Sequence, residues 1–424
     1  DHTMRKTATL LLALLLALGL TAGCAPAAVS GTDLMAEVTP VSAPEPEPAP
    51  AAYTGAMAAF GWNLLRASAD NPGNLLLSPA SVHLALSMTA NGAAADTRTG
   101  MLELLTGTPD GIDALNEGAR GSLARWNDPS ADDRLSIANS IWFDLEFTPE
   151  NAFLQTNADH YAAAARQIDF RTPDAPDAVN RWVKEATRGV IPSILDKIPA
   201  DTVMYLVNAI HFKADWEEPF DANDTRARTF HAPGGDIETD FMHRGGSMQY
   251  LDGEDMRGIL LPYAGGRFGF FALLPDEGVS PRDLLGRYTD AQLQDFLAVL
   301  QTNKANFSVG LALPVFETEY KDSLKNELIA MGMENAFDPA VADFSGIQQA
   351  MGRELYIGDV LHRTFCRVDE KGTEAAAATA VQIDKESMPS YDVEMTFDRP
   401  FLYGIADLAS SLPMFIGILE NPVE

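Results

Sequence analysis

The side chains that could carry out catalysis are few and widely separated in this sequence. Its seven histidines stand singly, and neither of its two cysteines, Cys24 and Cys366, has a histidine beside it. We find no G-x-S-x-G, H-E-x-x-H, phosphate-binding-loop or dinucleotide glycine motif, and no cysteine pair with zinc-site spacing. A dispersed site stays open, because catalytic triads assemble from residues far apart in sequence. We therefore expect no metal, no cofactor and no enzymatic activity.

The charge of the chain narrows the class of its partners. Its 424 residues include 60 acidic and 30 basic side chains, a formal net charge of −30. Such an acidic chain repels phosphate and sulfate polyanions, so we expect neither nucleic acid nor heparin to bind. Hydrophobic residues make up 46% of the chain, which is typical of a soluble globular protein, and two cysteines cannot form a disulfide framework.

The elements that must position any functional side chains change type along the chain. Residues 56–65 and 82–90 have apolar residues at helical spacing, the second with Ser81 as a possible N-cap. Strand patterns follow at residues 136–143, 203–212 and 268–274, and a C-terminal hairpin is predicted from residues 401–405 and 413–419. Helices first and a large sheet later predict an α+β fold.

The first 52 residues have the pattern of a leader followed by a tether. Arg5 and Lys6 precede an apolar run at residues 10–20 that is too short to span a bilayer, which predicts a signal peptide over residues 1–23. Residues 20–24 resemble the lipobox of bacterial lipoproteins, with Thr21 where leucine is usual. The resemblance implies lipidation at Cys24 and an extracytoplasmic place on the cell membrane or surface. The alternative is secretion by an ordinary signal peptide with an incidental cysteine.

Six prolines between residues 25 and 52 favour an extended, solvated stalk over residues 24–52, with a disordered leader as the alternative. From Tyr53 to Glu424 no second proline-rich linker, charge block or repeat interrupts the chain. We therefore expect residues 53–424 to form a single domain.

An alanine tract near the C-terminus does not fit a static domain. In a strand, one face of the tract would carry Thr373, Ala375, Ala377 and Thr379, and the other Glu374, Ala376, Ala378 and Ala380. Such small side chains can enter between existing strands without a large clash, and Gly372 can supply the backbone freedom of a hinge. A short helix is the alternative, although the tract has no bulky apolar face to stabilise one. We expect a long exposed loop over residues 370–396.

Residues 368–381 resemble the reactive-loop hinge of serpins, serine protease inhibitors that trap their target by inserting a cleaved loop into a central sheet. Six further motifs resemble those of the family and follow in its order, at residues 74–82, 208–216, 261–263, 274–276, 398–402 and 421–422. The resemblance covers about residues 53–424. It implies the serpin fold, with N-terminal helices around a large central β-sheet, further sheets and an exposed reactive-centre loop, in a monomer.

The resemblance also implies roles for individual residues. The hinge would consist of Glu370, Gly372, Thr373, Glu374, Ala375, Ala376, Ala377, Ala378 and Thr379. Ser78, Ser81, Asn208 and His362 would form a polar cluster where the strands part. Each residue alone is better explained as an N-cap serine or a satisfied core polar residue, and only the four together, in family order, favour the cluster. Trp216 would pack where the loop enters the sheet, which a plain core tryptophan would also explain. Cys366 is most simply a buried thiol.

The family spacing of 17 residues, counted from Glu370, places the reactive bond between Glu386 and Ser387. A glutamate there suits a glutamate-preferring protease, whereas a shifted register would present Lys385 to trypsin-like enzymes or Met388 to chymotrypsin-like ones. The implied function is inhibition of a serine endopeptidase as a suicide substrate, with a cysteine protease as the alternative target. The alternative is a non-inhibitory serpin that acts as a chaperone or binding protein. Such members carry bulky, charged or proline residues in the hinge, and this hinge has small ones.

Overall fold

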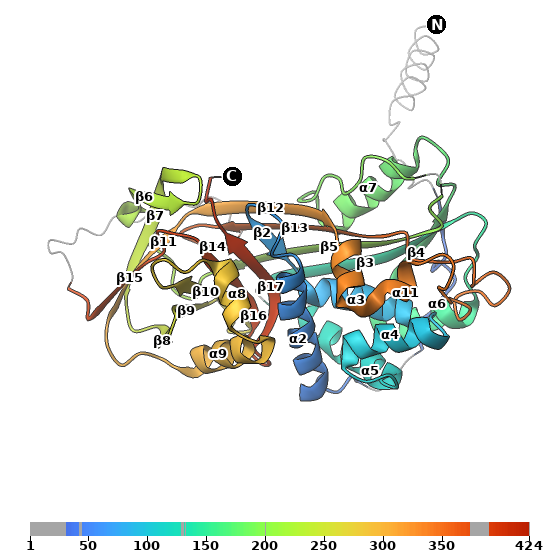
Figure 1. The fold of residues 1–424 in the computed structure, drawn as a ribbon, viewed down its shortest axis with the longest axis horizontal. Coiled ribbons are helices and arrows are strands. Elements are labelled where there is room, and N and C mark those ends of the chain that lie inside the picture. The colour runs from blue at the N-terminus through green and yellow to red at the C-terminus, as the bar shows by residue number, and fades with distance from the viewer. Residues whose placement is uncertain are drawn as a thin grey trace, which may run out of the picture. The chain divides into compact units, whose positions relative to one another are not determined.

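Three β-sheets and a set of helices make up the chain from Gly31 onward (Figure 1). The computed structural model describes residues 31–41, 45–128, 131, 133–199, 201–373 and 390–423. None of the helices within these ranges is long and apolar enough to cross a membrane.

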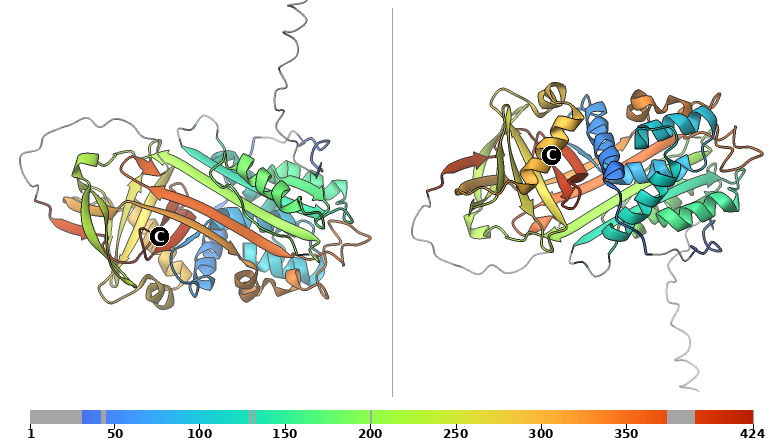
Figure 2. Two further views of the ribbon diagram at one scale, coloured as in Figure 1. Left: turned by 90° about the horizontal axis from the view of Figure 1, so that it is seen from above. Right: turned by 90° about the horizontal axis from the view of Figure 1, so that it is seen from below.

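The largest sheet has seven strands and runs across the molecule (Figures 1 and 2). Its order is β1 (Thr32–Asp33), β4 (Ala164–Ile168), β3 (Arg134–Asp144), β5 (Met204–Asp215), β14 (Gly372–Thr373), β13 (Asp359–Val368) and β12 (Phe316–Ser323). Strands β5 and β13 also pair directly with each other, in parallel, from Tyr205 and Asp359 to Ile210 and Thr364. This direct pair is the seam along which a further strand would have to be added.

Two smaller sheets complete the β structure. The six-stranded sheet has the order β2 (Leu75–Leu77), β17 (Leu412–Leu419), β16 (Phe401–Asp407), β10 (Phe268–Pro275), β9 (Met256–Pro262) and β8 (Gln249–Asp252). The four-stranded sheet has the order β15 (Val393–Thr396), β11 (Val309–Pro314), β7 (Gly235–Gly246) and β6 (Arg226–Ala232). Every residue of β10, β16 and β17 is buried, so the six-stranded sheet forms much of the core.

The helices gather mainly on one face of the seven-stranded sheet, and α7 lies on the opposite face (Figure 1). They are α2 (Ala51–Ala67), α3 (Pro79–Ala90), α4 (Ala95–Thr106), α5 (Ile112–Trp126), α6 (Asn151–Tyr161), α7 (Ala175–Ala186), α8 (Pro281–Arg287), α9 (Asp290–Thr302), α10 (Lys325–Leu328) and α11 (Glu334–Phe337), with short turns η1 (Ala222–Asp224) and η2 (Ile329–Met333). Thr289 and Gln292 form a capping box that begins α9, because each side chain satisfies a backbone N–H of the first turn.

The predicted elements correspond closely to those observed. The strand patterns at residues 136–143, 203–212 and 268–274 are β3, β5 and β10, and the C-terminal hairpin is β16 and β17. One detail is wrong: helix α3 begins at Pro79 with Ser78 as its N-cap residue, so Ser81 lies inside the first turn. The fixed φ of proline suits the first helical position and sets this earlier start.

The structure describes residues 31–41 and 45–50 of the predicted stalk over residues 24–52, and we call this part the strap. The prediction that it extends freely into solvent is wrong. Strand β1 pairs with β4, and Asp33 forms an ion pair with Arg166 at 3.3 Å. Further along, the N–H of Val41 donates to Asp159 on α6. The prediction relied on the proline content of this segment. The strap also contains Leu34, Met35 and Val38, and these apolar side chains pack against the core.

Candidate functional site

Strand β14 is two residues long and already lies between two long parallel strands. Gly372 and Thr373 pair antiparallel with Asp215 and Ala214 of β5, and Thr373 also pairs with Val368 of β13. A Cβ atom added at Gly372 would lie 2.1 Å from the backbone oxygen of Ala214. Only glycine therefore fits at this point, where the entering chain touches β5.

The segment after β5 holds the backbone that leads into β14. The N–H of Trp216 donates to the carbonyl of Lys371 at 2.7 Å, and its indole Nε1 donates to the carbonyl of Asp369 at 2.8 Å. The N–H of Phe220 donates to the carbonyl of Glu370 at 2.8 Å, and Thr225 donates its hydroxyl to the carboxylate of Glu370 at 2.7 Å. Three successive carbonyls of the hinge are thus bound before any cut is made.

The side chain of Thr373 is buried beneath the sheet, with 1% of its surface exposed. Its hydroxyl lies 2.5 Å from the phenol oxygen of Tyr263, whose ring stacks on Trp216 with centroids 4.7 Å apart. Burial raises the pKa of Tyr263 well above its ordinary value, so the phenol keeps its proton and can share the hydrogen bond with Thr373. Trp216 therefore supports the hinge from below, at the place expected for it.

The four residues expected to form a polar cluster do lie together. The N–H of Ser78 donates to His362 Nε2 at 3.1 Å, while His362 Nδ1 and Asn208 Oδ1 are 2.8 Å apart. Asn208 Nδ2 donates to Ser81 at 2.5 Å and to Asn139 at 2.7 Å. Sequence reasoning missed Asn139, although an amide within an apolar strand pattern was a visible signal; only the pairing of β3 with β5 places it opposite Asn208.

The cluster requires a neutral histidine. Because Nε2 of His362 accepts a hydrogen bond, its proton must sit on Nδ1, where it is donated to Asn208. Burial lowers the pKa of His362 to about 3. His362 and Asn208 are direct partners across the seam, so any strand added between β5 and β13 has to part this hydrogen bond.

The far end of the loop region is attached to a different sheet. Strand β15 pairs in parallel with β11, and the carboxylate of Asp392 accepts hydrogen bonds from the backbone and hydroxyl of Ser308 at 2.8 and 2.9 Å. These bonds lower the pKa of Asp392.

The remaining predicted residues lie outside the described ranges: Cys24, Glu374, Ala375, Ala376, Ala377, Ala378, Thr379, Lys385, Glu386, Ser387 and Met388.

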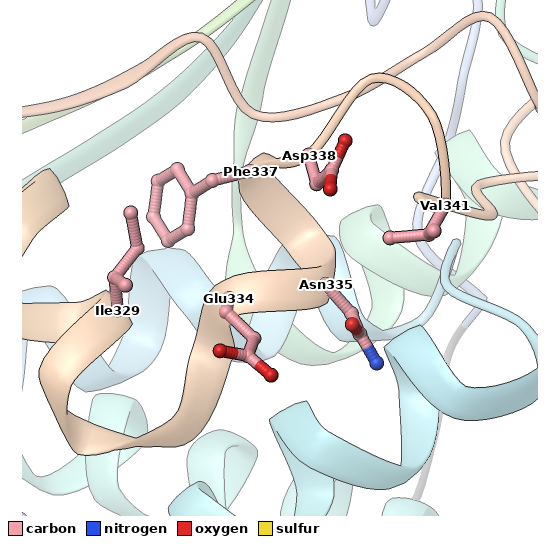
Figure 3. Close-up of a pocket in the computed structure, with 6 residues that line it drawn as sticks. All are labelled: Ile329, Glu334, Asn335, Phe337, Asp338 and Val341. Carbon is pink, nitrogen blue, oxygen red and sulfur yellow. The ribbon is translucent and has the colours of Figure 1, made fainter.

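Two further features bear on catalysis. A surface hollow of about 470 Å³ is lined by Ile329, Glu334, Asn335, Phe337, Asp338 and Val341 (Figure 3). Its lining holds two carboxylates and an amide, and includes no serine, cysteine, histidine or lysine. Within the described ranges, no group of three or more His, Cys, Asp and Glu side chains is arranged to hold a metal ion.

The family model described as "Serpin (serine protease inhibitor)" matches residues 55–422. This chain belongs to the serpin family. A serpin-like protein of Thermococcus kodakarensis is 34% identical over 372 residues, which cover 87% of this chain and 85% of that protein.

Solved structures agree with this assignment. The thermophilic serpin tengpin in its native state superposes with a TM-score of 0.85 and 34% identity, covering 92% of this chain and 99% of that one. Thyroxine-binding globulin in complex with thyroxine is similar with a TM-score of 0.77 and 25% identity, over 88% of this chain and 99% of that one. The fold of this serpin is therefore the expected one, with its helices, its large central sheet and its two further sheets.

Proposed function

We propose that this serpin inhibits a serine endopeptidase as a suicide substrate. The observation that carries the proposal is strand β14, which begins a new strand between β5 and β13 while the polypeptide is uncut. Beyond Glu374, residues Ala375 to Ala378 are small enough to continue that strand between its neighbours. A loop cut after them is released from β15 and can add to the sheet.

In this mechanism the protease attacks the bond between Glu386 and Ser387 and forms an acyl-enzyme on the carbonyl of Glu386. The leaving amine departs with the chain that begins at Ser387. If the loop enters the seam before water hydrolyses the ester, the protease is carried along and cannot complete its cycle. The serpin supplies no catalytic group, and only the protease breaks and forms covalent bonds.

The test uses the chain from Gly31 onward, mixed with a glutamate-specific and with a trypsin-like serine protease. We expect a complex that survives a denaturing gel, and a new N-terminus at Ser387 by mass spectrometry. A new N-terminus at Glu386 or at Pro389 would instead assign the reactive residue as Lys385 or Met388. Complete cleavage by a wide panel of proteases, with no complex and no inhibition, would contradict the proposal.

A serpin that binds a ligand or protein without inhibiting is the second candidate. The observation that favours it is the structural similarity to thyroxine-binding globulin. In the same experiment this candidate predicts simple cleavage of the loop and retained binding of the ligand. The small residues of the hinge favour inhibition.

We also propose that Cys24 is lipidated and that the serpin acts as a monomer on the outer face of a cell membrane. The support is the lipobox-like sequence at residues 20–24. Expression of the full chain in bacteria should give a membrane-associated protein, and Cys24→Ala should release it into the soluble fraction. A Cys24→Ala protein that fractionates with the membrane as the wild type does would contradict the anchor.

A further inference from the structure

The direct pairing of strands β5 and β13 stops part-way along them, and β14 lies between them only at the far end of the remaining stretch. The direct pairing of β5 with β13 ends at Ile210 and Thr364. The pairing of β14 begins at Ala214 on one side and Val368 on the other. The ladder between β5 and β13 therefore stops before residues 211–213 and 365–367, and the ladders of β14 lie beyond them. We call these six residues the fork.

The register of β14 determines what would lie in the fork. In an antiparallel ladder, one further residue on one strand meets one earlier residue on its partner. Thr373 pairs with Ala214 and Val368, so the next residue, Glu374, would meet Lys213 on β5 and Arg367 on β13. The fork holds three residues on each side and therefore has room for residues 374–376.

Strand alternation decides which face the carboxylate of Glu374 takes. Thr373 is buried on the inner face, so in a strand continued beyond it the side chain of Glu374 would point to the outer face. Lys213 and Arg367 share that outer face, because their strand neighbours are buried inward and they are not. Directly opposite residues in a sheet have Cβ atoms about 5 Å apart, within reach of an ion pair on both sides.

The positive charge at the fork is balanced on one side only: Glu317 on β12 is the cross-strand partner of Arg367, whereas the partner of Lys213 on β3 is Arg134, a second cation. Lys213 has no ion pair among the described residues, and Arg367 lies 3.6 Å from Asp369 with half of its side chain exposed. After burial, the nearby Arg188 and Lys213 are the causes that lower the pKa of His211 in the fork to about 4. This cationic gap lies in a chain of net charge −30.

We propose that Lys213 and Arg367 form the binding site for the carboxylate of Glu374, and that this double ion pair sets the register in which the loop enters the sheet. The inference rests on the insertion mechanism proposed above. A slip by one residue would turn Glu374 to the inner face, where its charge would be buried without a partner, and would leave an alanine between the two cations. Filling the fork breaks no pair between β5 and β13.

The experiment compares charge reversal with its compensation. The chain is cut in its loop by a glutamate-specific protease, and the melting temperatures of cut and uncut protein are measured for each variant. K213E/R367E reverses the charge of the binding site, and E374K reverses the charge of the side chain that would bind there. The triple variant K213E/R367E/E374K again places opposite charges against each other. K184E/K197E is the matched control, because it makes the same change in net charge at two exposed positions that are not part of the fork.

We expect the gain in melting temperature on cutting to fall by about 1–4 °C in K213E/R367E and in E374K, and to recover in the triple variant. The amount of serpin consumed per protease inhibited should rise about twofold or more in the same two variants. The proposed ion pair would be contradicted if the gain in melting temperature fell equally in K213E/R367E and in the control, or if it did not recover in the triple variant. A wild type that gains no stability on cutting would overturn the insertion mechanism itself.

Discussion

The hydroxyl of Thr373 lies 2.5 Å from the phenol of Tyr263, beneath the central sheet of an uncut chain. The start of the hinge, at Gly372 and Thr373, is therefore already part of the sheet before any protease acts. The expectation that the exposed loop would start at Glu370 is wrong by at least four residues, because residues 370–373 are bound by β5, β13 and the segment after β5. Insertion of the cut loop extends an existing strand, and does not have to nucleate one.

Thr373→Arg should act on the uncut protein as well as on insertion. An arginine at this fully buried position cannot keep its charge hydrated, so we expect the hinge to leave the gap and the protein to become a substrate. The loss of the Tyr263 partner should lower the free energy of unfolding by about 1–3 kcal/mol in a urea titration. Thr373→Val, which keeps the shape, should lose about 1 kcal/mol and still form the complex. An arginine variant that inhibits normally would contradict this account.

Gly372→Ala should displace the hinge from β5. Its Cβ would lie 2.1 Å from the carbonyl oxygen of Ala214, and backbone cannot yield as a flexible side chain can. We expect a cost of about 1–3 kcal/mol in unfolding free energy and faster proteolysis of the loop. The control is Gly286→Ala, in α8, where an added Cβ meets nothing within 4 Å and helix propensity favours alanine. Similar effects of the two substitutions would show that the contact at Ala214 is not tight.

Acid should destabilise this serpin through its buried histidines. Burial lowers the pKa of His83 to about 4 and that of His362 to about 3, both below the 6.5 of an unfolded histidine. Folding therefore favours the neutral form, so the stabilisation is complete above pH 6.5 and is lost as the pH falls toward 4. For His83 the full loss is about 3 kcal/mol. Urea titrations between pH 8 and pH 4 measure this slope.

Two variants separate the stability effect from the functional one. His83→Phe and His362→Asn should each flatten the pH dependence of stability, since each removes one buried histidine. Only His362→Asn should change the fraction of serpin that forms the complex, because His83 lies against Tyr53 and Phe60, away from the seam. An unchanged slope in both variants would show that other groups dominate the acid response.

Removal of the strap should cost stability. A chain beginning at Ala51 leaves the edge of β4 without a partner and exposes the apolar surface that Leu34 and Val38 cover. We expect the free energy of unfolding to fall by about 1–3 kcal/mol relative to the chain beginning at Gly31. Leu34→Ser should reproduce part of the loss, whereas Val41→Ser, at a side chain that is 64% exposed, should not. Equal urea midpoints for the two chains would show that the strap contributes nothing.

Sequence patterns predicted helices α2 and α3 and strands β3, β5, β10, β16 and β17 because each of these signals is local. The strand pattern at residues 268–274 is apolar throughout, as suits a strand buried on both faces, and it forms β10. The polar cluster was different: no spacing in the sequence relates Ser78 to His362, and only the resemblance to a family brought them together. Asn139 belongs to no motif of that resemblance and was therefore missed.

What the sequence by itself determined is the α+β fold, its family and a hinge whose side chains are small enough to enter a sheet. What only the tertiary structure decided is that the strap packs on the core, that Gly372 and Thr373 already lie in the sheet, and that Lys213 and Arg367 lie on the two sides of the fork. Each of these depends on the register between strands more than 100 residues apart in sequence. Local propensity carries no information on such pairings, because packing and hydrogen bonding across the whole sheet select them.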